Sequence, residues 1–100
     1  GCAKVECLGA TCSSDCTEGG CELDCDEGGQ CDYTCSGGGC PFDCDNGSTC
    51  KVDCTGGGCD VACDAGSTCN VDCSDAATPC TVTCGGGTAT CTGNCTMNGC

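Results

Sequence analysis

The spacing of the cysteines constrains the fold of this chain more than any other feature. Between Cys12 and Cys95 the motif C-x3-C occurs nine times, while the gaps between successive motifs vary from four to six residues. Cys12, Cys31, Cys50 and Cys69 are each 19 residues apart. The chain is therefore a tandem repeat with two C-x3-C motifs in each repeat, in which the motifs are regular elements and the variable gaps are loops.

The residues inside each motif predict a β-strand. The central position is apolar in most motifs, as at Leu23, Tyr33, Phe42, Val52, Val61, Val71 and Val82. The resulting pattern C-x-Φ-x-C, where Φ is apolar, has a period of two and puts both cysteines and the apolar residue on one face of a strand. Glycine-rich segments interrupt the chain too often for a stable helix.

These strands predict an all-β protein, a small flattened β-solenoid with about 19 residues and two short strands per coil, braced by a ladder of disulfides. Two kinds of turn alternate along the chain, one glycine-rich and one beginning with Asp, so a solenoid stacks like turns on like turns. An up-and-down meander is the alternative fold. We expect a single domain over residues 1–100, with an N-terminal cap at 1–11 and an atypical C-terminal coil at 74–100.

Disulfides must replace a conventional core, because the chain has 21 cysteines and only ten large apolar residues. So many cysteines in a short chain indicate an oxidising compartment, and we expect a secreted or cell-surface protein. The sequence shows no signal peptide and no apolar stretch of the roughly 20 residues that a membrane span needs. We therefore interpret it as a mature form.

Strand geometry limits the disulfide pairing. Two cysteines four residues apart on a strand are roughly 13 Å apart, beyond the reach of a disulfide, so each disulfide is expected to close a turn. A bridge within one coil, such as Cys12–Cys25, is the alternative. The expected pairs are Cys7–Cys12, Cys16–Cys21, Cys25–Cys31, Cys35–Cys40, Cys44–Cys50, Cys54–Cys59, Cys63–Cys69, Cys73–Cys80, Cys84–Cys91 and Cys95–Cys100.

This pairing leaves Cys2 over, and three interpretations of it remain open. The Gly1–Cys2 pair is similar to the end of a bacterial lipobox, which implies a lipid anchor on Cys2. Alternatively, Cys2 is a free or intermolecular thiol, or the disulfide register differs from the expected one.

The charge and the missing residue types exclude several functions. Fifteen acidic residues against two lysines give a net charge of −13, which argues against nucleic-acid binding. The chain has no His and no Arg, which removes the usual acid–base residue and the usual anion-binding side chain. We therefore expect a protein without enzymatic activity and without a tightly bound cofactor.

Acidic side chains recur at outward positions of the strands. Stacked carboxylates repel one another, and a divalent cation such as calcium would relieve this repulsion. The candidate metal ligands are Asp24, Asp26, Asp43, Asp45 and Asp64. A second column of acids is expected on the other face, at Asp15, Asp53 and Asp72. The simpler interpretation is that these acids keep exposed strands soluble.

Hydroxyl residues form a further row, because a threonine precedes the first cysteine of several motifs. These residues are Thr11, Thr49, Thr68 and Thr90. In a disulfide-braced solenoid, such rows resemble those of insect antifreeze proteins, which implies ice binding as a further alternative. Residues 76–100 carry no charge, so this end of the chain is either a cap or a surface for self-association.

From Cys7 onward the chain resembles the C-x3-C-x-G-G-G-C tandem repeats of secreted or surface proteins from myxobacteria-like bacteria. That resemblance implies an extracellular module of unknown function and supplies no catalytic residue. The segment GGGCDVACD at 56–64 is also similar to the nonapeptide of the calcium β-roll, although the turn Asp of that repeat is missing.

The leading functional hypothesis is a hyperstable, extracellular structural or interaction module. Calcium binding and ice binding are the alternatives. A reduced protein that binds metal through its thiolates is a further alternative, although the C-x2-C spacing typical of zinc sites does not occur.

Overall fold

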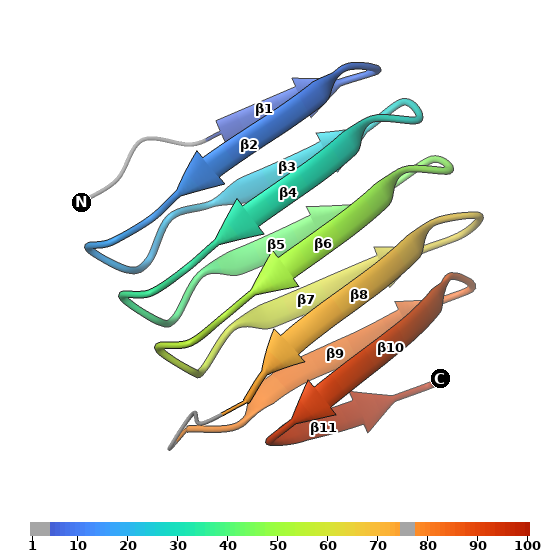
Figure 1. The fold of residues 1–100 in the computed structure, drawn as a ribbon. Coiled ribbons are helices and arrows are strands. Elements are labelled where there is room, and N and C mark those ends of the chain that lie inside the picture. The colour runs from blue at the N-terminus through green and yellow to red at the C-terminus, as the bar shows by residue number, and fades with distance from the viewer. Residues whose placement is uncertain (1–4, 75–77) are drawn as a thin grey trace.

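The computed structural model describes residues 5–74 and 78–100, and this part of the chain contains strands and turns but no helix. The strands are β1 (Val5–Leu8), β2 (Thr11–Asp15), β3 (Leu23–Asp26), β4 (Gln30–Thr34), β5 (Pro41–Cys44), β6 (Thr49–Asp53), β7 (Asp60–Asp64), β8 (Thr68–Cys73), β9 (Cys80–Gly85), β10 (Thr88–Gly93) and β11 (Cys95–Asn98). Successive strands alternate between two sheets that face each other (Figure 1). Sheet A contains the six odd-numbered strands and sheet B the five even-numbered strands.

The register between strands confirms a β-solenoid with about 19 residues per coil. Cys12 is paired with Cys31, Cys31 with Cys50, and Cys50 with Cys69, and all of these pairings are parallel. A meander would pair sequence neighbours antiparallel in one sheet. Here sequence neighbours lie in opposite sheets, so the meander is excluded.

The core is a thin layer between the inner faces of the two sheets. Leu23, Phe42, Val61 and Val82 form one inward column in sheet A. Tyr33, Val52 and Val71 form the facing column in sheet B. All seven side chains are buried. Because the large apolar residues are so few, buried cysteines at both ends of the central strands, β3 to β8, complete the core.

Eight of the expected disulfides are confirmed, and each closes the turn between two consecutive strands. Their Cα–Cα distances are between 6.1 and 6.4 Å. They are Cys7–Cys12, Cys16–Cys21, Cys25–Cys31, Cys35–Cys40, Cys44–Cys50, Cys54–Cys59, Cys63–Cys69 and Cys73–Cys80.

The last two expected pairs, Cys84–Cys91 and Cys95–Cys100, are wrong: the structure pairs Cys84 with Cys100 and Cys91 with Cys95. The reason is the register of β10, in which Ala89 takes the column of Cys69 and Cys91 lies two residues further, in the column of Val71. A shift of two residues keeps Cys91 on the inner face of the strand. It also removes the cysteine that would have closed the turn with Cys84.

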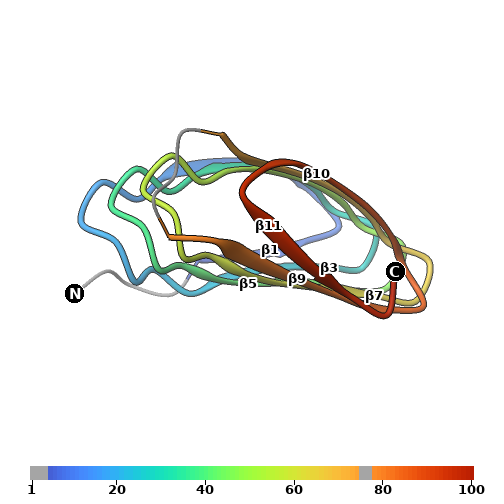
Figure 2. The ribbon, with the colours of Figure 1, turned by 90° about the horizontal axis from the view of Figure 1, so that it is seen from below.

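The Cys91–Cys95 bridge also corrects the expectation that no C-x3-C pair is bonded. That expectation requires the motif to run straight along one strand, as it does in β8 and β9, which each contain both cysteines of a motif. Here β10 ends at Gly93 and β11 begins at Cys95, so the chain turns between the two cysteines and their Cα atoms are 6.3 Å apart. In Figure 2 the last coil turns back well inside the edge at which the earlier coils turn.

The two edges of the solenoid are built from different turns. At one edge, the turns after Asp26, Asp45 and Asp64 are closed by hydrogen bonds in which the N–H three residues later donates to the Asp carbonyl. At the other edge, glycine turns stack so closely that a Cβ on Gly37 or Gly56 would overlap the backbone of the preceding coil. The close stacking of the coils at this edge therefore requires glycine at these turn positions.

Cys2 lies outside the described residues, as does the rest of the chain before Val5. The three interpretations of Cys2 therefore remain predictions.

Candidate acidic site on sheet A

The acidic residues expected on sheet A form a compact cluster. Asp24 on β3 is paired in register with Asp43 on β5, and Asp45 follows one residue after the end of β5. Carboxylate oxygens of these three residues all lie within 4.8 Å of one another. Asp45 lies on the same outer face as Asp43, because the two side chains flank the inward-facing Cys44.

Two groups of this cluster have raised pKa values. A side-chain hydrogen bond with Asp64, burial, and the nearby negative charges raise the pKa of Asp45 to about 7. Burial, followed by the charges of Asp64 and Asp24, raises the pKa of Asp43. A hydrogen bond between two carboxyl groups requires a proton on one of them. The raised pKa of Asp45 places this proton on Asp45, which faces Asp64 of the adjacent coil.

Asp26 differs from the other predicted ligands in its contacts. The Asn46 side chain donates to Asp26 Oδ1 at 2.6 Å, and the backbone N–H of Glu27 donates to the same oxygen at 2.8 Å. Three of the five predicted ligands, Asp24, Asp43 and Asp45, therefore lie together in one cluster. Asp64 is connected to this cluster by its hydrogen bond with Asp45. One oxygen of Asp26 is instead used in hydrogen bonds that hold two adjacent turns together.

A shallow groove of about 320 Å³ runs beside the cluster on the outer face of sheet A. It is lined by Glu22, Leu23, Asp24, Pro41, Phe42, Asp43, Asp60 and Ala62. Sequence reasoning had not singled out Glu22 and Asp60, which occupy the first outward position of their strands. The alternation of the C-x-Φ-x-C motif was sufficient to find them.

Sheet B presents a different outer face. The expected column of Asp15, Asp53 and Asp72 is present, with Thr34 between the first two. Hydrogen bonds from Ser74 to the Asp72 carboxylate lower the pKa of Asp72. No carboxylate cluster involves this column in the described part of the chain.

The threonine row on sheet B is shorter than expected. Thr49, Thr68 and Thr88 are paired in one column, with Gln30 between Thr49 and Thr11. Thr88 stands where Thr90 was expected, because of the same two-residue shift that moves Cys91. Thr90 and Thr92 also face outward on β10, but Asp32 and Lys51 interrupt the face beside the threonine column. Ice binding remains an untested prediction.

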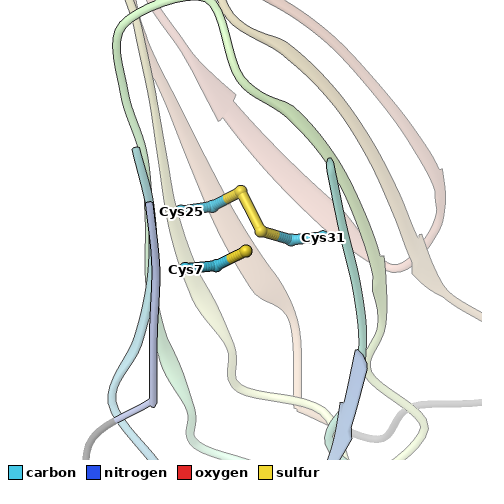
Figure 3. Close-up of side chains that lie close together, drawn as sticks. All are labelled: Cys7, Cys25 and Cys31. Carbon is cyan, nitrogen blue, oxygen red and sulfur yellow. A yellow bond between two sulfur atoms is a disulfide. The ribbon is translucent and has the colours of Figure 1, made fainter. Parts of the chain in front are cut away.

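The sulfur atoms form two columns inside the solenoid. Figure 3 shows Cys7 beside the Cys25–Cys31 bridge of the next coil, and the three sulfur atoms lie within 4.8 Å of one another. All cysteines among the described residues are in disulfides. In this oxidised form the described sulfurs are therefore structural and offer no thiolate to a metal.

Comparison with protein-family models, with curated proteins and with solved structures finds no match to this chain. The described residues contain no helix long and apolar enough to cross a membrane.

Proposed function

We propose that this protein is a rigid, non-enzymatic structural or interaction module that works outside the reducing cytoplasm. The observation that supports the proposal is the disulfide ladder, which closes the turns at both edges of the described solenoid. Such a ladder persists only where thiols are kept oxidised. Because the disulfides and the core lie between the sheets, the outer faces of both sheets contribute little to stability and can serve as fixed binding surfaces.

The outer faces support a role in interaction more than one in catalysis. The acidic groove on sheet A contains carboxylates but no histidine or cysteine thiol that could act as a base or nucleophile with them. Its shallow form suits contact with another surface better than enclosure of a small substrate.

The test compares the oxidised protein with the same protein after reduction and alkylation. We expect the oxidised form to keep its strand circular dichroism signal on heating to near the boiling point of water, and the reduced form to lose it at room temperature. A reduced, alkylated protein that retains its strands and its cooperative melting would overturn the proposal, because the ladder would then be dispensable.

Divalent-cation binding is a second candidate function, favoured by the convergence of Asp24, Asp43 and Asp45 on one point of sheet A. Calcium takes oxygen ligands in flexible geometry and would compete with the proton on Asp45. Calorimetric titration with calcium near neutral pH should show binding with release of protons. Asp45→Asn should abolish it, whereas Asp53→Asn on sheet B should leave it intact. The absence of heat at millimolar calcium would remove this candidate.

A further inference from the structure

The C-terminal end of the solenoid is an open edge of both sheets. Within the described chain, β10 is hydrogen-bonded to β8 alone and β11 to β9 alone, so each presents an unpaired row of backbone N–H and C=O groups. Natural edge strands are usually protected from such pairing by charges, prolines or bulges. Neither β10 nor β11 carries a charged residue or a proline.

The C-terminal end also exposes apolar side chains. Met97 ends the inward column of sheet A and is 39 % exposed, and Ala89, Cys91 and Cys95 are only partly buried. At the other end, the inward column of sheet B finishes with the polar Ser14, but β1 exposes Leu8 at 56 %, so apolar exposure does not distinguish the two ends.

Charge does distinguish the two ends. All charged residues of the chain lie between positions 4 and 75. The N-terminal edge carries Glu6 on β1 and Asp15 on β2, both exposed, so two N-terminal ends brought together would repel. Two C-terminal ends would meet without charge and would hold the acidic coils of the two molecules far apart.

The shape of the C-terminal end suits a second copy of itself. Sheet A has one strand more than sheet B, so β11 extends half a coil beyond β10. The two strands run in opposite directions (Figure 1). A two-fold axis parallel to the strands would set the projecting β11 of one copy against the recessed β10 of the other, with the strands antiparallel. Each six-stranded sheet would then continue into a five-stranded sheet of the partner.

We propose that the protein forms a two-fold dimer through the free edges of β10 and β11. The inference rests on the interaction role proposed above and names a second copy of this chain as the partner. The end of the stack is no larger than about 31 by 15 Å between Cα atoms, so it buries less surface than a standard stable interface. The dimer is therefore weak and depends on concentration.

Sedimentation equilibrium of the oxidised protein from micromolar to millimolar concentration tests the proposal. We expect the average mass to rise from that of one chain towards two and then to level off. Met97→Lys should weaken association at least tenfold, because it places a charge against its symmetry mate at the dimer edge. Thr96→Lys, which faces outward on the same strand, should also weaken it and cannot disturb the core. The control Ser13→Lys, on the N-terminal edge strand β2, should leave association unchanged.

Three results would overturn the dimer. They are a single-chain mass at every concentration, association that Ser13→Lys weakens, and a mass that grows beyond two chains, since that indicates head-to-tail stacking. The comparison of the oxidised and reduced proteins on heating, described above, tests the proposed function without depending on the dimer. A monomer that survives heating removes the dimer and leaves the disulfide-braced module in place.

Discussion

The central coils and the last coil obey the same inward–outward alternation but use it differently. From β3 to β8, cysteines occupy both ends of every inward strand face, and each turn is closed within its own coil. In the last coil, Ala89 and Gly93 take the columns of Cys69 and Cys73, and Cys100 bridges back to Cys84 on the preceding strand of sheet A. Disulfide pairing is therefore decided by which column a cysteine occupies, and not by its order in the sequence.

This difference has a structural consequence at the end of the stack. A coil in the middle is held by hydrogen bonds to a coil on each side, whereas the last coil has a neighbour on one side. The Cys84–Cys100 bridge spans 16 residues and ties the last strand to the coil before it. The central ladder stiffens each coil, and the terminal bridge joins two coils.

The largest expected effect is that of adding a methyl group to a central glycine turn. A Cβ on Gly56 would overlap the backbone of Gly38 in the coil below, so Gly56→Ala must separate two stacked turns. We expect a loss of about 3 kcal/mol or more in the free energy of unfolding, typical of severe overpacking. Chemical denaturation of the variant gives this value.

The matched change in the last coil is Gly86→Ala. Gly86 has a φ of +99° and its added Cβ would meet nothing closer than 3.4 Å, so it suffers backbone strain but no overlap. We expect a cost of about 1 kcal/mol. Equal costs at the two positions would show that overlap with the neighbouring backbone costs no more than the backbone strain of a left-handed turn.

Removing one disulfide from each region should have the next largest effect. The double variant Cys54→Ala/Cys59→Ala opens a central turn and should lower the stability of the whole domain by about 2 kcal/mol or more, from loop entropy and the space left in the core. Cys84→Ala/Cys100→Ala should instead release β11 locally, because a terminal strand can detach while the rest stays folded.

Hydrogen exchange read residue by residue distinguishes these two outcomes. For the terminal pair, the amides of β11 should lose protection while those of β5 and β6 keep it. For the central pair, protection should fall throughout the stack. Loss of protection in the central strands of the terminal variant would mean that the last bridge supports the entire solenoid.

Much of the fold could be predicted from the sequence because its physical causes are local. The C-x-Φ-x-C alternation determines which side chains face inward, and the constant motif length with variable gaps separates strands from turns. Strand geometry excluded the C-x3-C pairs and favoured bridges across the turns, and eight of these expected bridges are present. In β10, however, both Ala89 and Cys91 satisfy the inward alternation, so the pattern could not decide between them. The position of Cys100, where the chain folds back on Cys84, decides it.

The acidic site was only partly predictable for a similar reason. The 19-residue period places Asp24 beside Asp43, because both lie on strands in register. The same period places Asp45 beside Asp64, one position beyond the register pair of Cys44 and Cys63, but whether their carboxyl groups bond depends on how the side chains lie at the turn. The involvement of Asn46 with Asp26 is likewise a contact between turns.

A smaller effect is expected from pH, and it should be confined to the central coils. The folded-state pKa of Asp45, about 7, is above the value of about 3.9 for an unfolded Asp. Between these values the native state holds more protons than the unfolded chain, so stability should fall as pH rises from 4 to 7 and level off above 7. The partly exposed cluster limits this change to about 1 kcal/mol.

Unfolding measured against pH in the variant Asp45→Asn checks this assignment. In this variant the free energy of unfolding should fall much less between pH 4 and pH 7. The variant should therefore be more stable than the parent at pH 8, and the two should be similar at pH 4. The last coil has Gly85 opposite Asp64 and lacks the acid that would extend the cluster. Asp53→Asn, which removes one charge from sheet B, should leave the decline in place. If it suppressed the decline equally, general repulsion among the acids would be the cause.

The smallest expected effect concerns the core of the early coils. Tyr33 is fully buried and its ring packs against Phe42 with centroids 5.0 Å apart, but its hydroxyl finds no hydrogen-bond partner among the described residues. An unsatisfied buried hydroxyl costs about 1–3 kcal/mol, whereas the ring supplies apolar contacts that Phe would keep. Tyr33→Phe should therefore raise the free energy of unfolding by up to about 1 kcal/mol, although most core substitutions lower it. Val71→Ala, two coils away in the same column of sheet B, should destabilise the protein in the usual way. A Tyr33→Phe variant that is less stable than the parent would show that the hydroxyl is satisfied in solution, and that the core of the first coils admits a water which the later valine-lined coils exclude.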